Sequence, residues 1–396
     1  MVDIGIRFMY LIPPAITLVI LLLLKRGYFS PEVILFLKNS ILMFWVPLLF
    51  EMFMPEGYVA AEYKTTALIL NSIYSITYLS MVLLMSILFF RNDARFRKKL
   101  NVFVTNSRRL FLIAILAFVF LITYAKLDFM GLVLEPRLIY QYNRFGQGIY
   151  YATYVVLINI FVLNLTFLNR NVKLKSAVLV ILVSMFLGYF SASKSVILYQ
   201  LLLLIIAYSY KNRPSFLKQT LVLIIVSCSI FIVFPLFGEL TEAAKILLYF
   251  DHFRNNIVFF EMFSPKIDYF WSSFWGYVPR SIFPSKPFVY GDIYLTELLY
   301  PGIAQKGHTV GGLPYTLYLI SFGALGVAFS ATIDILSIET LKHLFVRFPN
   351  YFTLTLTLHF LFIPIFKYFP PLFAVILALI IHLFFKLRLR ISLKIH

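Results

Sequence analysis

Long apolar runs separated by short polar segments dominate the pattern along this chain. Several of these runs exceed the roughly 18 residues that a helix needs to cross a bilayer core of about 30 Å. The runs are apolar on all sides, whereas strands of a membrane barrel alternate apolar and polar residues. Because only helices and closed barrels satisfy their backbone hydrogen bonds inside lipid, the pattern predicts an all-α polytopic membrane protein.

The runs predict about eleven transmembrane helices in a single transmembrane domain spanning 1–396. They lie at 6–24, 33–53, 66–90, 109–126, 149–168, 174–190, 195–210, 219–237, 309–335, 351–366 and 368–386. The segment 127–148 is predicted to be a moderate loop, and 238–308 a large extracytoplasmic loop of about 70 residues that contains short helices. Its part 239–263 is helix-like but carries too many charges to span, so we expect it at the membrane surface.

Charged residues are divided unevenly between the two sets of helix ends. One set holds 21 basic residues against three acids, Glu32, Asp93 and Glu339. The basic residues are Lys25, Arg26, Arg91, Arg95, Arg97, Lys98, Lys99, Arg108, Arg109, Arg170, Lys173, Lys175, Lys211, Arg213, Lys218, Lys342, Arg347, Lys386, Arg388, Arg390 and Lys394. The opposite ends hold 13 basic and 13 acidic residues, and Lys38 and Asp334 fall within predicted helices. By the positive-inside rule the N-terminus is predicted outside and the C-terminus in the cytoplasm.

This distribution changes what the net charge of +18 implies. The excess is orientation charge rather than a nucleic-acid-binding surface, so no nucleic-acid partner is expected. The basic run 91–100 also suits contact with anionic membrane lipid. The single cysteine, Cys228, lies in an apolar run and excludes an intrachain disulfide.

Cations on the predicted outer side need another explanation, because the positive-inside rule disfavours them there. Arg137 and Arg144 lie in the moderate loop, Lys194 in the turn FSASKS (190–195), and Arg254 in the large loop. Arginine and lysine at a membrane surface suit a phosphate or diphosphate ligand. The alternative is that they pair with the outer acids on a solvated loop.

Two passages of the large loop are more specific. WGYVPRSIFPSKP (275–287) combines three prolines with Arg280 and Lys286, and proline makes such a loop rigid and non-helical. In QKGHTVGGLPYTLYLISFGALG (305–326), His308 precedes a glycine-rich helix start. Histidine transfers protons near neutral pH, so His308 is a candidate base, although a single loop histidine is often incidental.

Outer-loop aromatic residues could stack against sugar rings or anchor the protein at the membrane interface. The candidates are Tyr140, Tyr142, Trp271, Trp275, Tyr277 and Tyr290. The sequence contains no glycine-rich nucleotide loop, His-x-x-x-His pair or DxD motif, so we expect neither a metal nor a nucleotide cofactor.

The combined pattern resembles the Wzy-type O-antigen and polysaccharide repeat-unit polymerases. The resembling features are the many helices with one dominant outer loop, the string Pro-Arg-Ser-x-Phe-Pro-x-Lys-Pro at 279–287, and His308 with the following glycine-rich segment. The turn FSASKS is similar to a turn in these polymerases and in O-antigen ligases that often carries arginine. Here Lys194 takes that place, which keeps the charge but loses bidentate geometry.

The resemblance implies a metal-independent glycosyltransferase in the cytoplasmic membrane of a bacterium. It implies transfer of a growing glycan from undecaprenyl diphosphate to a fresh lipid-linked repeat unit, with a chain-length regulator and a flippase as protein partners. We expect Arg280 to act on the donor diphosphate together with Lys194, Arg254 and Lys286, while Arg137 and Arg144 hold the acceptor diphosphate or close over the donor. His308 is the first candidate for the base, with Glu261, Asp251 and Asp292 in reserve.

Two alternatives remain open at this point. An O-antigen ligase would share the donor site and differ only in its acceptor. A flippase or other transporter would depend instead on ionisable residues within helices, where Lys38, Asp334, His359 and His382 are candidates.

Overall fold

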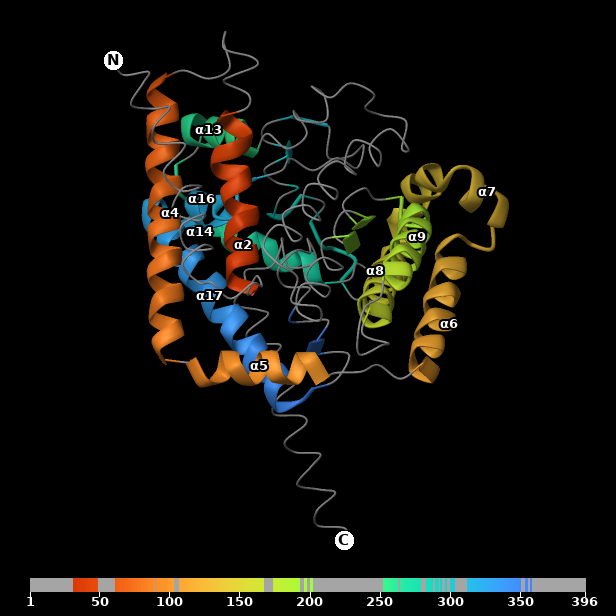
Figure 1. The fold of residues 1–396 in the computed structure, drawn as a ribbon. Helices are drawn as coiled ribbons and strands as arrows, with labels where there is room; N and C mark the ends of the chain where they lie inside the picture. The colour runs from red at the N-terminus through yellow and green to blue at the C-terminus, as the bar shows by residue number, and fades with distance from the viewer. Residues whose placement is uncertain are drawn as a thin grey trace, which may run out of the picture.

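A computed structural model provides the fold of the chain (Figure 1). It describes residues 31–48, 61–88, 90–102, 107–166, 174–192, 196–197, 200–201, 252–262, 264–278, 283–287, 289–291, 293, 296–297, 300–302, 312–349, 353–354 and 357. These residues are mostly helical, and no strand occurs among them, which confirms the predicted helical class.

Within the described ranges, three helical stretches are long and apolar enough to cross a membrane: Pro31–Leu48, Lys64–Met85 and Ala324–Arg347. They correspond to α2 (Pro31–Ser40) with the π-helix η1 (Ile41–Trp45), to α4 (Ala61–Leu88) and to α17 (Ala324–Arg347). These helices pack into one bundle, whose core includes Phe44, Tyr74 and Phe345. Other faces of the bundle expose large apolar side chains such as Ile76 and Ile87, which is compatible with a membrane protein.

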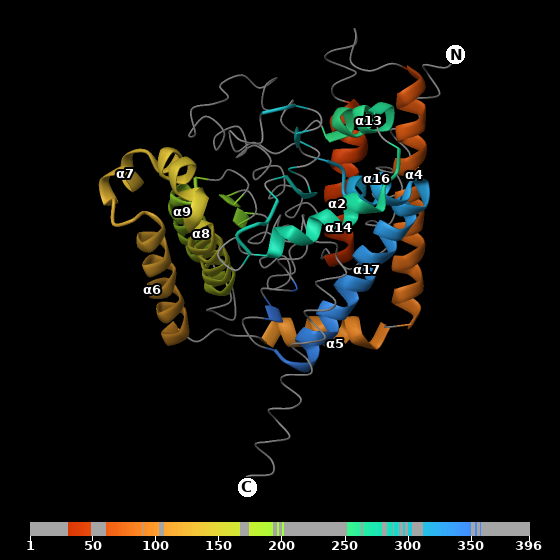
Figure 2. The same cartoon turned by 180° about the vertical axis from the view of Figure 1, so that it is seen from behind.

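The predicted basic run forms a separate helix, α5 (Phe90–Val102). It follows α4 directly and lies across the end of the bundle (Figures 1 and 2). Phe96 and Leu100 are buried, and the Phe96 ring meets the Phe345 ring of α17 edge-on with centroids 5.4 Å apart. Arg95, Lys98 and Lys99 are exposed, so α5 is an amphipathic helix that covers this end of the bundle.

A second group comprises α6 (Ser107–Tyr124), α7 (Phe129–Leu134), α8 (Pro136–Thr166) and α9 (Leu174–Phe190). The bounds of α9 agree with the predicted helix 174–190. The prediction of a loop at 127–148 was wrong, because α7 and the first half of α8 occupy it. Asp128 caps α7 by accepting a 2.8 Å hydrogen bond from the Gly131 amide, and Pro136 suits the first helical position.

The described parts of the predicted outer loop contain the short helices α13 (His252–Met262) and α14 (Ile267–Ser272) and the 3-10 helix η3 (Ser273–Tyr277). Short helices were predicted here, and α13 lies within the surface helix expected at 239–263. In Figures 1 and 2, α13 lies at the end of the bundle opposite α5. By contrast, α14 lies at a level between α13 and α5 in both views. Its Phe270 ring lies 5.9 Å from the Tyr318 ring and 5.3 Å from the Phe322 ring of α16, so this part of the chain turns back into the bundle.

The prediction of one continuous helix at 309–335 was wrong. The structure has α16 (Thr316–Phe322), a break at Gly323, and then α17. Gly323 has φ +64°, a conformation that favours glycine, and it separates two helix axes. A Cβ on Gly326 would lie 2.1 Å from the Tyr318 carbonyl oxygen, so glycine permits the close approach of α16 and α17.

Several predicted helices lie outside the described residues. They are 6–24, 219–237 and 368–386, together with most of 195–210 and 351–366.

Candidate functional site

The described residues include only part of the predicted site. The side chains of Arg137, Arg254 and Lys286 are described. Arg144 lies on α8 and Glu261 on α13, both placed by their backbone. The five remaining candidates lie outside the described residues: His308, Arg280, Lys194, Asp251 and Asp292.

The structure brings Arg137 against the turn that precedes Lys194. Arg137 lies in the first turn of α8, and its Nη1 donates a 3.3 Å hydrogen bond to the carbonyl oxygen of Ala192. Its guanidinium also lies 5.9 Å from the centre of the Tyr140 ring, within the range of a cation–π contact. Two segments that the sequence singled out separately are therefore neighbours.

The turn after α9 is held in place by α8. Tyr151 donates a 2.9 Å hydrogen bond to the Ser191 carbonyl oxygen, and Tyr154 donates a 2.8 Å bond to that of Leu187. These bonds satisfy carbonyl groups at a helix C-terminus, which have no partner within the helix. Ala192 adopts φ +51°, a strained conformation for a non-glycine residue that persists only where surrounding contacts fix it. The segment that leads to Lys194 is thus preorganised.

Lys286 lies inside the proline-rich loop rather than on its surface. Lys286 is only 8% exposed, and its Nζ donates a 3.0 Å hydrogen bond to the Val278 carbonyl oxygen. The same ammonium lies 4.1 Å from the centre of the Tyr290 ring. These contacts close the loop around the segment that carries Arg280, a role for Lys286 that sequence reasoning missed.

Arg254 is exposed on α13, at the end of the bundle opposite α5. The other face of α13 is buried: Phe253, Asn256 and Ile257 have little or no exposure. Asn256 accepts a 2.7 Å hydrogen bond from Thr316 and donates one of 3.3 Å to the Tyr315 hydroxyl. The amphipathic helix is therefore fixed to α16, with Arg254 directed away from the core.

Two of the predicted aromatic candidates, Trp271 and Trp275, each pack against a phenylalanine ring in a tilted arrangement. The Trp271 ring lies 5.3 Å from the Phe274 ring, and the Trp275 ring lies 5.2 Å from the Phe283 ring. Trp271 is 56% exposed and Phe283 is 44% exposed. Such rings can stack against an apolar ligand face or anchor the loop at an interface.

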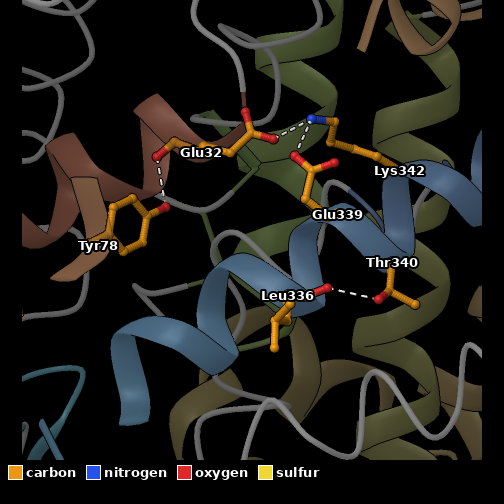
Figure 3. Close-up of polar contacts among 6 residues, drawn as sticks. All are labelled: Glu32, Tyr78, Leu336, Glu339, Thr340 and Lys342. Carbon is orange, nitrogen blue, oxygen red and sulfur yellow. Dashed lines mark hydrogen bonds and ion pairs between the residues drawn. The ribbon is translucent and has the colours of Figure 1, made fainter. Parts of the chain in front are cut away.

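Sequence reasoning also missed an ion-paired group within the bundle. Lys342 of α17 lies 2.5 Å from Glu32 of α2 and 2.8 Å from Glu339, and Lys342 and Glu32 are almost completely buried (Figure 3). The Tyr78 hydroxyl donates a 2.8 Å bond to the Glu32 backbone carbonyl. The sequence assigns these residues to the basic set of predicted helix ends, and only the spacing of Glu339 and Lys342 along one helix face indicates a pair.

The described residues contain no group of histidine, cysteine and acidic side chains suited to a metal ion. The chain matches no known protein family or curated protein in sequence, and no solved structure in fold.

Proposed function

We propose that this protein is a polysaccharide polymerase of the cytoplasmic membrane of a bacterium. In this proposal it spans the membrane about eleven times, with the N-terminus outside, and joins undecaprenyl-diphosphate-linked repeat units at the outer face. The observation that supports the proposal best is the contact of Arg137 with the turn at Ala192, because Arg137 is then a neighbour of the segment that leads to Lys194.

The chemistry requires stabilisation of a leaving diphosphate. The bond between the donor's anomeric carbon and the diphosphate oxygen breaks, and that carbon forms a bond to the acceptor hydroxyl oxygen. Positioned cations neutralise the charge that develops on the diphosphate, an effect commonly worth several kcal/mol. In this proposal Arg280, Lys194 and Arg254 act on the donor, and Arg137 and Arg144 hold the acceptor diphosphate or close over the donor.

The acceptor hydroxyl must also lose its proton. His308 is the proposed base, and Glu261, Asp251 and Asp292 are the alternatives. Lys286 is proposed to position the loop that carries Arg280, since its ammonium already contacts the Val278 carbonyl and the Tyr290 ring.

A reconstitution assay tests the proposal. Purified protein receives an undecaprenyl-diphosphate repeat unit without metal or nucleotide, and products are separated on a gel beside Arg280→Ala and Arg137→Ala. A ladder spaced by one repeat, lost in both variants and kept in the exposed-lysine control Lys266→Ala, is the expected result. A folded wild-type protein that makes no ladder refutes the polymerase, and glycan transfer to a lipid A core acceptor would then identify the ligase.

A second candidate, a transporter for the same lipid-linked glycan, rests on a different observation. Asp334 lies buried within α17 and accepts a 2.6 Å hydrogen bond from Tyr74. Ionisable residues inside membrane helices often serve substrate or ion pathways. Loss of lipid-linked glycan translocation in Asp334→Asn vesicles, with no ladder from the wild type, would favour this candidate.

A further inference from the structure

Asp334 joins three helices through a chain of buried hydrogen bonds. Its carboxylate on α17 accepts a 2.6 Å bond from the Tyr74 hydroxyl of α4. That hydroxyl in turn accepts a 2.8 Å bond from the side-chain amide nitrogen of Asn39 on α2. Tyr74 and Asn39 have essentially no exposure, so a negatively charged group and two polar groups lie together inside the bundle.

One buried side-chain oxygen within this chain of bonds, and another on a residue one helical turn from Asp334, lack a hydrogen-bond partner among the described residues. The side-chain oxygen of Asn39 belongs to the amide that bonds Tyr74, and Ser330 lies one helical turn before Asp334 on α17. Each residue is 1% exposed, and neither oxygen has a hydrogen-bond partner within the part of the chain that the structure describes. Buried polar atoms in folded proteins nearly always have a hydrogen-bond partner, so each of these oxygen atoms calls for an explanation.

The backbone of α2 is irregular at the same place. The π-helix η1 begins at Ile41, directly after Asn39 and Ser40, and the Val46 amide bonds to the Ile41 carbonyl five residues earlier. The Ser40 hydroxyl is a further buried oxygen without a partner among the described residues. Insertions of π-helix are rare and occur frequently at functional sites. Such a local change in backbone pattern is also how membrane helices present oxygen atoms to ions.

We propose that Asp334, Asn39 and Ser330 bind a monovalent cation, with sodium as the representative ion. The candidate ligands are all oxygen atoms, which suit hard cations. One carboxylate balances a single positive charge, whereas sites for divalent cations usually draw on several carboxylates. Lys38 precedes Asn39 on α2, and its positive charge favours the ionised form of Asp334 and would compete with a bound cation. Within the part of the chain that the structure describes, a separate charged group of the bundle, formed by Glu32, Glu339 and Lys342, is paired internally.

The cation-binding proposal does not depend on the glycan reaction, so it can be tested independently of the proposed function. The test uses the full chain in nanodiscs. Radioactive sodium binding is measured directly, and thermal unfolding is compared in sodium chloride and choline chloride. The wild type is expected to bind sodium and to unfold at a higher temperature in sodium than in choline.

The test includes two variants of the proposed ligands, and the two substitutions differ in how strongly they are expected to disturb folding. Asp334→Asn is expected to abolish sodium binding. Ser330→Ala is expected to weaken it by about tenfold or more, a difference of about 1.4 kcal/mol, while stability in choline stays equal or rises because a buried hydroxyl without a partner is removed. Ser184→Ala on α9 is the matched control. This buried serine already donates a hydrogen bond to the Val180 carbonyl of its own helix, and α9 does not belong to the bundle that holds Asp334.

Three outcomes overturn the proposal. The first is wild-type protein that binds no sodium and unfolds alike in both salts. The second is sodium binding that survives unchanged in Ser330→Ala and in any folded Asp334→Asn. The third is a Ser330→Ala protein that gains the same stability in sodium as in choline, which identifies the serine oxygen as unsatisfied rather than ligating.

Discussion

The Nζ atom of Lys342 lies 2.5 Å from a carboxylate oxygen of Glu32, although 310 positions separate the two residues in the sequence. Glu339 provides a second carboxylate 2.8 Å from the same ammonium. The group therefore ties the start of α2 to the last part of α17, close to where α5 crosses the bundle (Figure 1). One ammonium faces two carboxylates, and this ratio determines how substitutions should behave.

Lys342→Met is expected to destabilise the protein strongly. The change leaves the buried carboxylate of Glu32 and the partly buried carboxylate of Glu339 without their counter-ion, and breaking a buried ion pair in this way typically costs about 3–5 kcal/mol. Denaturant and thermal unfolding in detergent, followed by tryptophan fluorescence, measure the loss.

Two further variants give this prediction its controls. Glu339→Gln keeps a balanced Lys342–Glu32 pair, so its cost should stay within about 1 kcal/mol. Lys98→Met removes an exposed lysine from α5 and should change stability by no more than about 0.5 kcal/mol. A Lys342→Met protein as stable as the wild type would contradict the ion-paired arrangement.

Arg137→Ala is expected to reduce polymerisation by about 100- to 1000-fold, the usual effect of removing one positioned electrostatic donor. Arg137→Lys keeps the charge but not the bidentate geometry, so it should retain an intermediate rate. Initial rates of ladder formation at saturating lipid-linked repeat unit measure both variants.

The variant Tyr151→Phe distinguishes a direct role of Arg137 in the reaction from a purely structural role in holding the turn. That change removes the 2.9 Å hydrogen bond to the Ser191 carbonyl and loosens the same turn, yet leaves every cation in place. We expect a small effect on rate. A loss as large as that of Arg137→Ala would mean that Arg137 acts only by holding the turn.

Hydropathy alone was sufficient to predict the bounds of a helix that is apolar along nearly its whole length. The nearly uniform apolar run of α9 ends where the prediction placed it, at Phe190. The segment 127–148 was predicted wrongly because polar residues at a helix start look like a loop, although Asp128 and Pro136 carry helix-start signals. The break at Gly323 depends on a backbone conformation that an apolar glycine-containing run does not reveal.

The candidate site was predictable only in part, for a related reason. Residue type and position indicated Arg137 and the turn after α9, but their contact depends on how α8 and α9 pack. Counting charges assigned Glu32 and Lys342 to a solvated end, since a count does not detect pairing across the fold. Lys286 was predicted to bind an anion because proline-rich loops suggest rigidity, whereas the internal carbonyl that it bonds becomes apparent only in three dimensions.

Lys286→Met is expected to loosen the proline-rich loop without unfolding the protein. The variant keeps an apolar stem but loses the bond to the Val278 carbonyl and the contact with the Tyr290 ring. A hydrogen bond from a charged group contributes about 1.5–3 kcal/mol, and here the loss is local. Hydrogen–deuterium exchange of peptides covering 278–290 should accelerate.

The exchange experiment has two internal comparisons. Lys286→Arg keeps the charge and the ability to contact the ring, so its exchange should stay near that of the wild type. Lys266→Met removes an exposed lysine from the same region and should have no effect on this peptide. Unchanged exchange in Lys286→Met would show that the loop is held by other contacts.

Gly326→Ala tests the close packing of α16 and α17. The added methyl group would lie 2.1 Å from the Tyr318 carbonyl oxygen, so one helix must move. Overpacking of this kind typically costs about 1–3 kcal/mol, even though alanine is the better helix former by about 1 kcal/mol. Thermal unfolding measures the effect beside Leu325→Ala, whose side chain is 82% exposed. Equal stability of Gly326→Ala and the wild type would refute this approach of the two helices.

The orientation of the bundle follows from charge and can be tested with single cysteines. Cys228 is first replaced by alanine, and Lys98→Cys on α5 or Glu135→Cys between α7 and α8 is then introduced; both positions are exposed. The basic face of α5 predicts that its end of the bundle faces the cytoplasm. A membrane-impermeant maleimide should therefore label Glu135→Cys in intact spheroplasts, and Lys98→Cys only after permeabilisation. The reverse pattern would invert the topology, and with it the side from which the Arg137 region meets its substrate. Labelling of both positions in intact spheroplasts would instead contradict the placement of α5 and the α7–α8 junction on opposite sides of the membrane.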